Sequence, residues 1–136
     1  MTAVDAKSRI LLIDDDRDFT ASIGSLLENE GYAVETADSG KRGLQRLVES
    51  PPDLIVLDIM METSSEGYGV MQAIRFDEQY SEYQYIPVMM VSAVQTSPQE
   101  LFWKSSAGEM IRPDCYLTKP LDIPKFLQSL KRLLKK

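Results

Sequence analysis

The sequence contains no histidine and a single cysteine among its 136 residues. Without histidine, the chain cannot build a Ser-His-Asp or Cys-His catalytic arrangement, a His-ligated metal site or a phosphohistidine of its own. One cysteine cannot form an internal disulfide, and we interpret Cys115 as a reduced, small buried apolar residue beside a strand rather than a nucleophile. These absences exclude several classes of enzyme and suit a cytoplasmic protein.

Long apolar runs and clustered positive charge are also missing. No stretch approaches the roughly 20 apolar residues of a membrane span, and the N-terminal MTAVDAKSR lacks the apolar region of a signal peptide. Lys plus Arg number 15 against 21 Asp plus Glu, which gives a formal net charge of -6. That balance disfavours direct binding to a nucleic-acid backbone. We expect a cytoplasmic protein that contacts neither membrane nor nucleic acid.

What the sequence does contain is an alternation of apolar runs and helical periodicities, with no internal repeat. Strands are predicted at residues 10–13, 32–37, 54–57, 86–91 and 115–117, of which 10–13 and 54–57 are continuous apolar runs. Helices are predicted from Phe19 to Gly31, around 44–48, from about Tyr68, from the Ser97-Pro98 capping pattern, and over 123–134 with Asp122 as cap. Strict alternation predicts an α/β fold, a doubly wound five-stranded parallel sheet flanked by five helices.

Candidate site residues follow four of the five predicted strands, at the point where each strand ends. Asp14 and Asp15 follow the first strand, Asp58 the third, Ser92 the fourth and Lys119 the fifth. Ligands bind at the carboxyl ends of the strands in sheets of this kind. We therefore expect these side chains to form one site.

Three carboxylates brought together repel one another unless a cation lies among them. A hard divalent ion such as Mg²⁺ prefers carboxylate oxygens, and together with Lys119 it would bring the formal local charge to zero. Asp58 ends the central strand and is the candidate nucleophile, since a carboxylate can attack phosphorus to form an acyl phosphate. Ser92 and Lys119 are suited to the phosphoryl oxygens, and Asp14 and Asp15 to the metal.

On these residues the sequence resembles the receiver domains of two-component response regulators, over roughly residues 9–134. The motifs that carry the resemblance are ILLIDDD, PDLIVLDIMM, VMMVSA and CYLTKP. They place the family's acidic pair, phosphoacceptor, switch hydroxyl, switch aromatic and lysine at Asp14 and Asp15, Asp58, Ser92, Tyr116 and Lys119. The resemblance implies a flavodoxin-like (βα)5 fold, and we expect one receiver domain over 1–136 without an output domain.

The resemblance also implies a phosphorylation switch. A sensor histidine kinase or histidine phosphotransfer protein would donate the phosphoryl group to Asp58, with Mg²⁺ held by Asp14 or Asp15, Asp58 and the backbone carbonyl of Met60. Such a domain is no enzyme beyond its own phosphorylation and dephosphorylation.

In the family, Ser92 and Lys119 then move toward the phosphate and Tyr116 rotates inward. This remodels the face of the fourth helix, fifth strand and fifth helix, through which an unidentified downstream protein is contacted. A homodimer through this face stays open. The bond between Lys119 and Pro120 is usually cis.

Three segments depart from the family pattern. The loop 62–67 lacks the usual proline, and the stretch FDEQYSEYQY and the segment 94–114 run long. Met60 and Val94, which border the path of a hydrolytic water in the family, are both apolar. We therefore expect slow self-dephosphorylation.

Simpler interpretations remain for each residue taken alone. Asp16 or Asp18 is better explained as a helix cap, while Ser92, Lys119 and Tyr116 could be a turn residue, a surface lysine and a core aromatic. Packing or a partner surface is the expected role of four further aromatics, Tyr80, Tyr83, Tyr85 and Trp103.

Two other functions stay open. One is a receiver-like scaffold that never becomes phosphorylated. The other is a phosphohydrolase of the haloacid dehalogenase type, although the stretch from Asp14 to Asp18 lacks the threonine of its DxDxT-like run.

Overall fold

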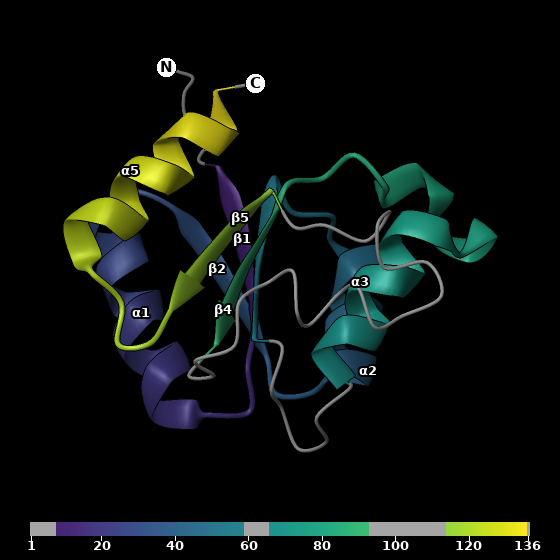
Figure 1. Cartoon of the computed structure of the whole chain (residues 1–136), viewed down its shortest axis with the longest axis horizontal. Coiled ribbons are helices and arrows are strands. Elements are labelled where there is room, and N and C mark those ends of the chain that lie inside the picture. The colour runs from purple at the N-terminus through teal and green to yellow at the C-terminus, as the bar shows by residue number, and fades with distance from the viewer. Residues whose placement is uncertain (1–7, 59–65, 93–113, 136) are drawn as a thin grey trace.

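A five-stranded parallel sheet forms the centre of the protein. The computed structural model describes residues 8–58, 66–92 and 114–135, and the strands within them are β1 (Arg9–Ile13), β2 (Ala33–Ala37), β3 (Leu54–Asp58), β4 (Val88–Ser92) and β5 (Cys115–Thr118). Their order is β2-β1-β3-β4-β5, and every neighbouring pair runs parallel (Figure 1). The chain winds first toward one edge and then toward the other, which confirms the predicted doubly wound α/β fold.

Helices cover both faces of the sheet. They are α1 (Arg17–Asn29), α2 (Gly40–Glu49), α3 (Glu66–Phe76) and α5 (Ile123–Leu134). Helices α1 and α5 lie on one face, and α2 and α3 lie on the other (Figure 1). Of the helices that the structure describes, none combines the length and the apolar character needed to cross a membrane.

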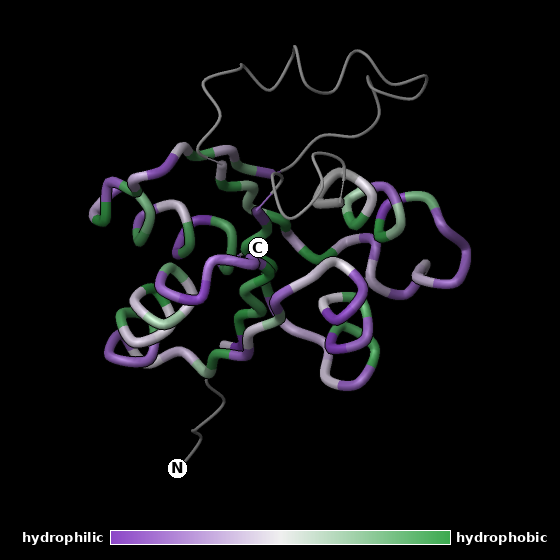
Figure 2. The backbone as a smooth tube through the Cα atoms, turned by 90° about the horizontal axis from the view of Figure 1, so that it is seen from below, coloured by the Kyte–Doolittle hydropathy of each residue, from purple (hydrophilic) through white to green (hydrophobic). Residues whose placement is uncertain are grey.

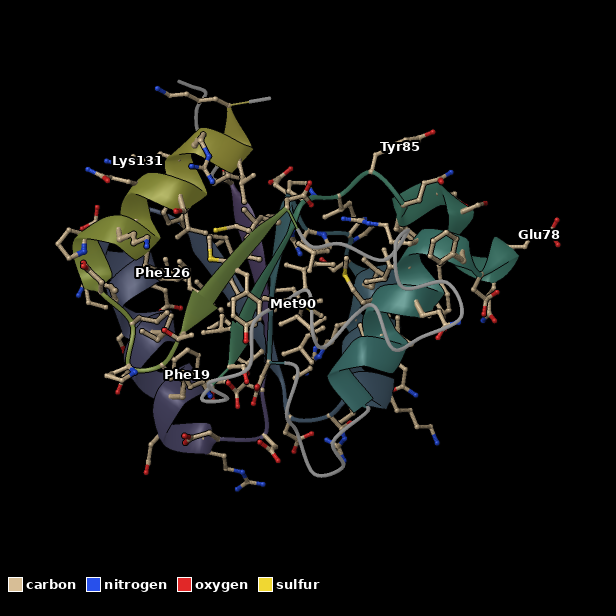
Figure 3. All side chains as sticks on the ribbon, viewed as in Figure 1. Phe19, Glu78, Tyr85, Met90, Phe126 and Lys131 are labelled. Atoms are coloured by element: carbon tan, nitrogen blue, oxygen red, sulfur yellow. The ribbon has the colours of Figure 1, made fainter. Side chains whose placement is uncertain are left out.

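The hydrophobic core consists of two layers separated by the sheet. All five residues of β3 and of β4 are buried, as is typical of parallel strands with helices on both sides. Phe126 of α5 is fully buried in one layer, and Met90 of β4 is fully buried in the other (Figure 3). Hydrophobic residues accordingly run through the centre of the molecule, while hydrophilic ones lie on the outer turns of the helices (Figure 2).

Two predicted caps fix where α1 and α5 begin. The Asp16 side chain accepts a hydrogen bond from the backbone N–H of Phe19, and the Asp122 side chain accepts one from Lys125. These bonds satisfy N–H groups that have no partner within the helix. At its other end α1 stops before Gly31, whose φ of +97° favours glycine. The Asp16 cap places α1 directly after the acidic run that follows β1.

Gly43 allows α2 to approach the sheet closely. A Cβ atom at this position would lie 2.5 Å from Cδ1 of Ile13, in the last residue of β1. No ordinary contact is that short, so a side chain here would push the helix away from the strand. The close approach brings the start of α2 beside the carboxyl end of β1.

Helix α2 begins at Gly40, four residues before the predicted stretch 44–48, and the other observed boundaries differ from the predicted ones by at most two residues. Strand β4 begins at Val88 rather than Ile86, because Pro87 has no N–H to add to the ladder. Helix α3 begins at Glu66, two residues before the predicted start. A 3₁₀ helix, η1 (Glu78–Tyr83), follows α3 in a stretch whose sequence shows no helical periodicity. The helix predicted from Ser97 lies outside the described residues.

The aromatic residues after α3 separate into two groups. Tyr80 and Tyr83 are partly buried and pack against the core layer beneath α2 and α3, in agreement with the packing role expected for them. Tyr85 is 87% exposed and points away from the sheet (Figure 3). Trp103 lies outside the described residues. Cys115 is half-buried at the start of β5 and has a free thiol, so it is less buried than expected.

An ionic network ties the amino-terminal edge of the sheet together. Arg75 of α3 donates to the carbonyl oxygens of Gln84 at 2.6 Å and Ile86 at 3.2 Å, and to the Asp114 carboxylate at 2.9 Å. The same carboxylate oxygen accepts from the backbone N–H of Val88, at 2.8 Å. Burial lowers the pKa of Arg75, and the neighbouring Asp114 opposes this change. One guanidinium thus joins α3, the segment after η1 and the first residues of β4 and β5.

We expect the substitution Arg75→Met to lower the free energy of unfolding by about 2–3 kcal/mol. Methionine keeps an apolar stem but leaves two carbonyl groups and the Asp114 carboxylate without the guanidinium donor. Because Asp114 is 37% exposed, the loss of stability should be smaller than that for a fully buried ion pair. Urea unfolding of both proteins measures the difference. Arg132→Met on the exposed side of α5 is the matched control. A change in Arg75→Met no larger than in that control would contradict the prediction.

Candidate functional site

Three carboxylates converge at the carboxyl-terminal edge of the sheet. The strand register pairs Ile13 with Leu57, so Asp14 and Asp58 follow side by side on neighbouring strands. One oxygen from each of Asp14, Asp15 and Asp58 lies within 4.8 Å of the others. The structure therefore brings together the acidic residues that the sequence places at the ends of the first and third strands.

Burial makes this proximity electrostatically costly. Asp14 is 3% exposed and Asp58 is 5% exposed, whereas Asp15 is not buried. Like charges at such distances destabilise one another unless cations compensate them, and they do so most where water is excluded. The cluster therefore requires positive charge close by.

Lys119 supplies part of that charge from the end of β5. Its ammonium group lies 2.7 Å from Oδ2 of Asp14 and 3.7 Å from Oδ2 of Asp58. Its backbone N–H donates to the carbonyl oxygen of Ser92, at 2.8 Å, which continues the pairing of β4 with β5 by one residue. The Lys119–Pro120 bond is cis, as the resemblance implies. Lys119 is thus bonded to Asp14 and stands within reach of Asp58.

Phe19 forms a further wall of the site, one that the sequence pattern does not indicate. The Lys119 ammonium lies 4.2 Å from the centroid of its ring, which is a favourable cation–π distance. In the sequence this residue fits the apolar stripe of a helix. Its position shortly after the acidic run is the one signal that could have placed it at the site. The Asp16 cap sets that position, because it fixes the first turn of α1 on which Phe19 lies.

Three hydrogen bonds hold Asp14 in place. Its Oδ2 accepts from Lys119, its Oδ1 accepts from the backbone N–H of Asp16 at 2.9 Å, and its own N–H donates to the carbonyl of Ala37. Both carboxylate oxygens therefore already have donors from the protein. This bonding fixes the orientation of Asp14 before any ligand binds.

Ser92 and Tyr116 share a hydrogen bond between their hydroxyl groups. Ser92 is fully buried at the end of β4, and Tyr116 is half-buried on β5 against the core layer below α2 and α3. Burial raises the pKa of the Tyr116 phenol, the Asp58 carboxylate raises it further, and the bond with Ser92 opposes the rise. The phenol therefore stays protonated at neutral pH, with its hydroxyl near the acidic cluster.

The donor set fits a hard divalent cation. Three carboxylates and one ammonium leave a formal local charge of -2, and oxygen ligands are those that Mg²⁺ prefers. Within residues 8–58, 66–92 and 114–135 this is the one group of three acidic, histidine or cysteine side chains so closely placed. Met60, whose carbonyl oxygen is the further ligand expected from the resemblance, lies outside the described residues, as do Val94 and the loop 62–65.

The fold and the site together define a class of protein. A parallel sheet of order β2-β1-β3-β4-β5, with an acidic cluster and a lysine at its carboxyl edge, is the arrangement of a flavodoxin-like receiver. Comparison with known proteins agrees. The model of the response regulator receiver domain family matches residues 10–131, and the chain belongs to that family. Members of this family are signalling receivers rather than classical enzymes.

Similar proteins include both long regulators and isolated receivers. The chain is 35% identical over 128 residues to the DNA-binding dual master transcriptional regulator RpaA of Synechocystis sp., which covers 94% of this chain and 49% of that protein. It spans about half the length of the curated relatives that it matches.

Two solved structures show the same fold. Chemotaxis protein CheY4 of Vibrio cholerae is similar with a TM-score of 0.77 and 26% identity, over 94% of this chain and 99% of that one. A putative response regulator from Chloroflexus aurantiacus J-10-fl has a TM-score of 0.79 and 23% identity, over 96% of this chain and 100% of that one.

Proposed function

We propose that the chain is a phosphoacceptor of a two-component system, which takes a phosphoryl group onto Asp58 in a Mg²⁺-dependent step. The donor is the phosphohistidine of a sensor histidine kinase or of a histidine phosphotransfer protein in the cytoplasm. The observation that carries this proposal is the ammonium group of Lys119, which lies 2.7 Å from the buried carboxylate of Asp14 and 3.7 Å from that of Asp58.

The proposed step is an in-line displacement at phosphorus. A carboxylate oxygen of Asp58 bonds to phosphorus, the P–N bond to the donor imidazole breaks, and the imidazole leaves with the bonding electrons. Lys119 compensates charge on the equatorial oxygens, for which its position between two carboxylates suits it. Asp14, Asp15, Asp58 and the carbonyl of Met60 would hold Mg²⁺. The ion would neutralise charge on the oxygens of the transferred group.

The proposed response to phosphorylation begins at Ser92 and Tyr116. A phosphoryl group on Asp58 offers oxygen acceptors close to the Ser92 hydroxyl and the Lys119 ammonium, which now bond to Tyr116 and Asp14. A change in these bonds would alter the face that includes β5 and α5. We propose that a downstream protein or a second copy of the chain reads this face, without direct binding to nucleic acid or membrane.

Labelling with a small phosphodonor tests the proposal. The protein is incubated with acetyl phosphate, once with Mg²⁺ and once with EDTA, and analysed by intact mass spectrometry. We expect one phosphoryl group per chain with Mg²⁺, located by fragmentation on the peptide that contains Asp58, and none with EDTA. The absence of label under both conditions would favour a scaffold, and steady turnover of p-nitrophenyl phosphate would favour the phosphohydrolase.

We further expect the phosphoryl group on Asp58 to be lost slowly. Met60 and Val94 are both apolar, so neither side chain can orient a hydrolytic water through a hydrogen bond. After removal of the phosphodonor, the phosphorylated fraction is followed by mass spectrometry over time, and its half-life should exceed minutes. Met60→Asn and Val94→Glu introduce polar side chains and should shorten it. Loss within seconds in the unaltered protein would contradict the expectation.

A further inference from the structure

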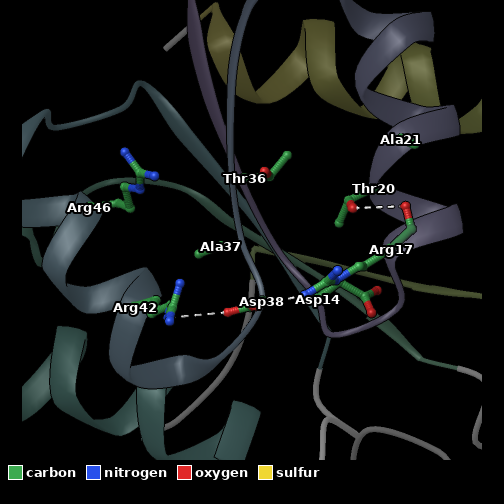
Figure 4. Close-up of a pocket in the computed structure, with 9 residues that line it drawn as sticks. All are labelled: Asp14, Arg17, Thr20, Ala21, Thr36, Ala37, Asp38, Arg42 and Arg46. Carbon is green, nitrogen blue, oxygen red and sulfur yellow. Dashed lines mark hydrogen bonds and ion pairs between the residues drawn. The ribbon is translucent and has the colours of Figure 1, made fainter.

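A basic pocket lies next to the acidic cluster, on the other side of Asp14. Its walls come from α1, the end of β2 and α2, and it has a volume of about 450 Å³ (Figure 4). The polar residues of its lining include Arg17, Thr20, Thr36, Asp38, Arg42 and Arg46. The volume is sufficient for a small organic ligand.

The charge of this pocket opposes that of the whole chain. Three of the seven arginines of a chain with net charge -6 line it. Of its two carboxylates, Asp14 is already bonded to Lys119, which leaves Asp38 as the counter-charge of three guanidinium groups. Arg17, Arg42 and Arg46 together with Asp38 therefore carry a formal charge of +2, beside the acidic cluster with its charge of -2. Clefts concentrate the field of such charges.

The existing ion pairs in the pocket are weak enough for a ligand to replace. Asp38 lies 4.0 Å from Arg17 and 3.5 Å from Arg42, and the two arginine side chains are 88% and 70% exposed. Long, exposed pairs of this kind contribute little to stability. Arg46 forms no ion pair with any residue that the structure describes. The guanidinium donors are therefore available to an anion.

Arg42 and Arg46 place two like charges on the same side of α2, although Arg46 in the last turn also suits the helix dipole. They are four residues apart on α2, so their like charges lie on the same side of the helix and repel each other. An anion between them would remove this repulsion. Thr36 adds a hydroxyl group from β2, and that group has no hydrogen-bond partner within the described part of the chain.

We propose that this pocket binds a small phosphate dianion, either inorganic phosphate or the phosphate group of a monoester such as a nucleoside monophosphate. Arg42 and Arg46 bind its oxygens through their paired N–H donors, a geometry in which arginine matches phosphate. Arg17 contributes a third positive charge from α1, so that the three arginines together balance Asp38 and the phosphate dianion. This site is separate from phosphorylation at Asp58 and does not require it.

Titration followed by NMR tests the proposal without interference from the acidic site. The Asp58→Asn protein, in EDTA, is titrated with sodium phosphate and separately with adenosine 5′-monophosphate at constant ionic strength. We expect saturable shifts of the backbone amides of Thr20, Thr36 and Arg46, with one molecule bound per chain. Equal affinity for the two probes would identify phosphate as the ligand, and tighter binding of the nucleotide would identify a monoester.

Substitutions then assign the binding to the arginines. Arg42→Gln and Arg46→Gln should each weaken binding by about tenfold, which corresponds to the loss of one charged contact. Arg132→Gln, which removes an exposed arginine from α5, should bind as tightly as the parent. Absence of saturation at millimolar phosphate, shifts elsewhere on the protein, or the same loss in all three variants would overturn the proposal. The outcome is independent of whether acetyl phosphate labels Asp58 in the unaltered protein.

Discussion

The substitution Asp58→Asn is expected to abolish phosphoryl uptake from acetyl phosphate. An amide is a far weaker nucleophile than a carboxylate, and Asp58 is the acidic residue at the end of the central strand β3. The other residues of β3 are apolar, so none of their side chains can replace Asp58 as the nucleophile. Intact mass spectrometry after incubation with Mg²⁺ and phosphodonor should therefore show only the unlabelled chain.

The same variant should be more stable than the parent protein in metal-free buffer. Asp58 and Asp14 are buried beside each other with one ammonium group between them, so removal of one negative charge relieves repulsion. We expect a gain of about 1 kcal/mol in the free energy of unfolding, measured with urea in EDTA. Glu28→Gln, on the exposed side of α1, is the matched control and should change neither labelling nor stability. Labelling of Asp58→Asn to the parental level would place the acceptor elsewhere.

The substitution Lys119→Met is expected to slow labelling of Asp58 by a factor of about 10²–10³. Methionine has a side chain of similar length, but it removes the ammonium group that lies 4.2 Å from the Phe19 ring centroid and 3.7 Å from Asp58. The nucleophile is unchanged, so the final extent of labelling should approach that of the parent protein when enough time is allowed. The initial rate of phosphoryl uptake at saturating Mg²⁺ is the quantity to compare.

Loss of Lys119 should also tighten the binding of Mg²⁺. Without the ammonium group, the three carboxylates carry a formal charge of -3 rather than -2, which favours a divalent cation. Lys131→Met removes an exposed charge from α5 and is the control for a change in net charge alone. A labelling rate within about threefold of that control would show that Lys119 has no role in the transfer.

The sequence predicts the central strands β1, β3 and β4 well because they are continuous apolar runs of the length that a buried parallel strand requires. β3 and β4 are buried at every position, and both end where a polar residue follows an apolar run. The same rule assigns Asp14, Asp58 and Lys119 to one edge. Local signals also suffice for the caps at Asp16 and Asp122, since a cap depends on residues only three positions apart.

A single sequence does not indicate which residues far apart along the chain are in contact. Arg75 and Asp114 are 39 residues apart, and nothing in either segment indicates that they meet. The shorter distance from Lys119 to Asp14 than to Asp58 likewise depends on register and side-chain reach, which composition does not determine. Arg17 and Arg46 appear as ordinary surface charges until α1 and α2 are placed on either side of β2.

The network at Asp114 gives the first end of β5 contacts beyond its pairing with β4. β5 pairs with β4 alone among the described strands, and at its first residues it is fastened by the Asp114 carboxylate to Val88 and Arg75. Its last residues lead to Lys119, beside the carboxylates. At its other end β5 is held by its pairing with β4, which continues through Thr118 to the Lys119 N–H. We therefore expect a displacement that begins at Lys119 to diminish toward Asp114. We accordingly expect phosphorylation to change amide hydrogen exchange in β5 more at Thr118 than at Cys115.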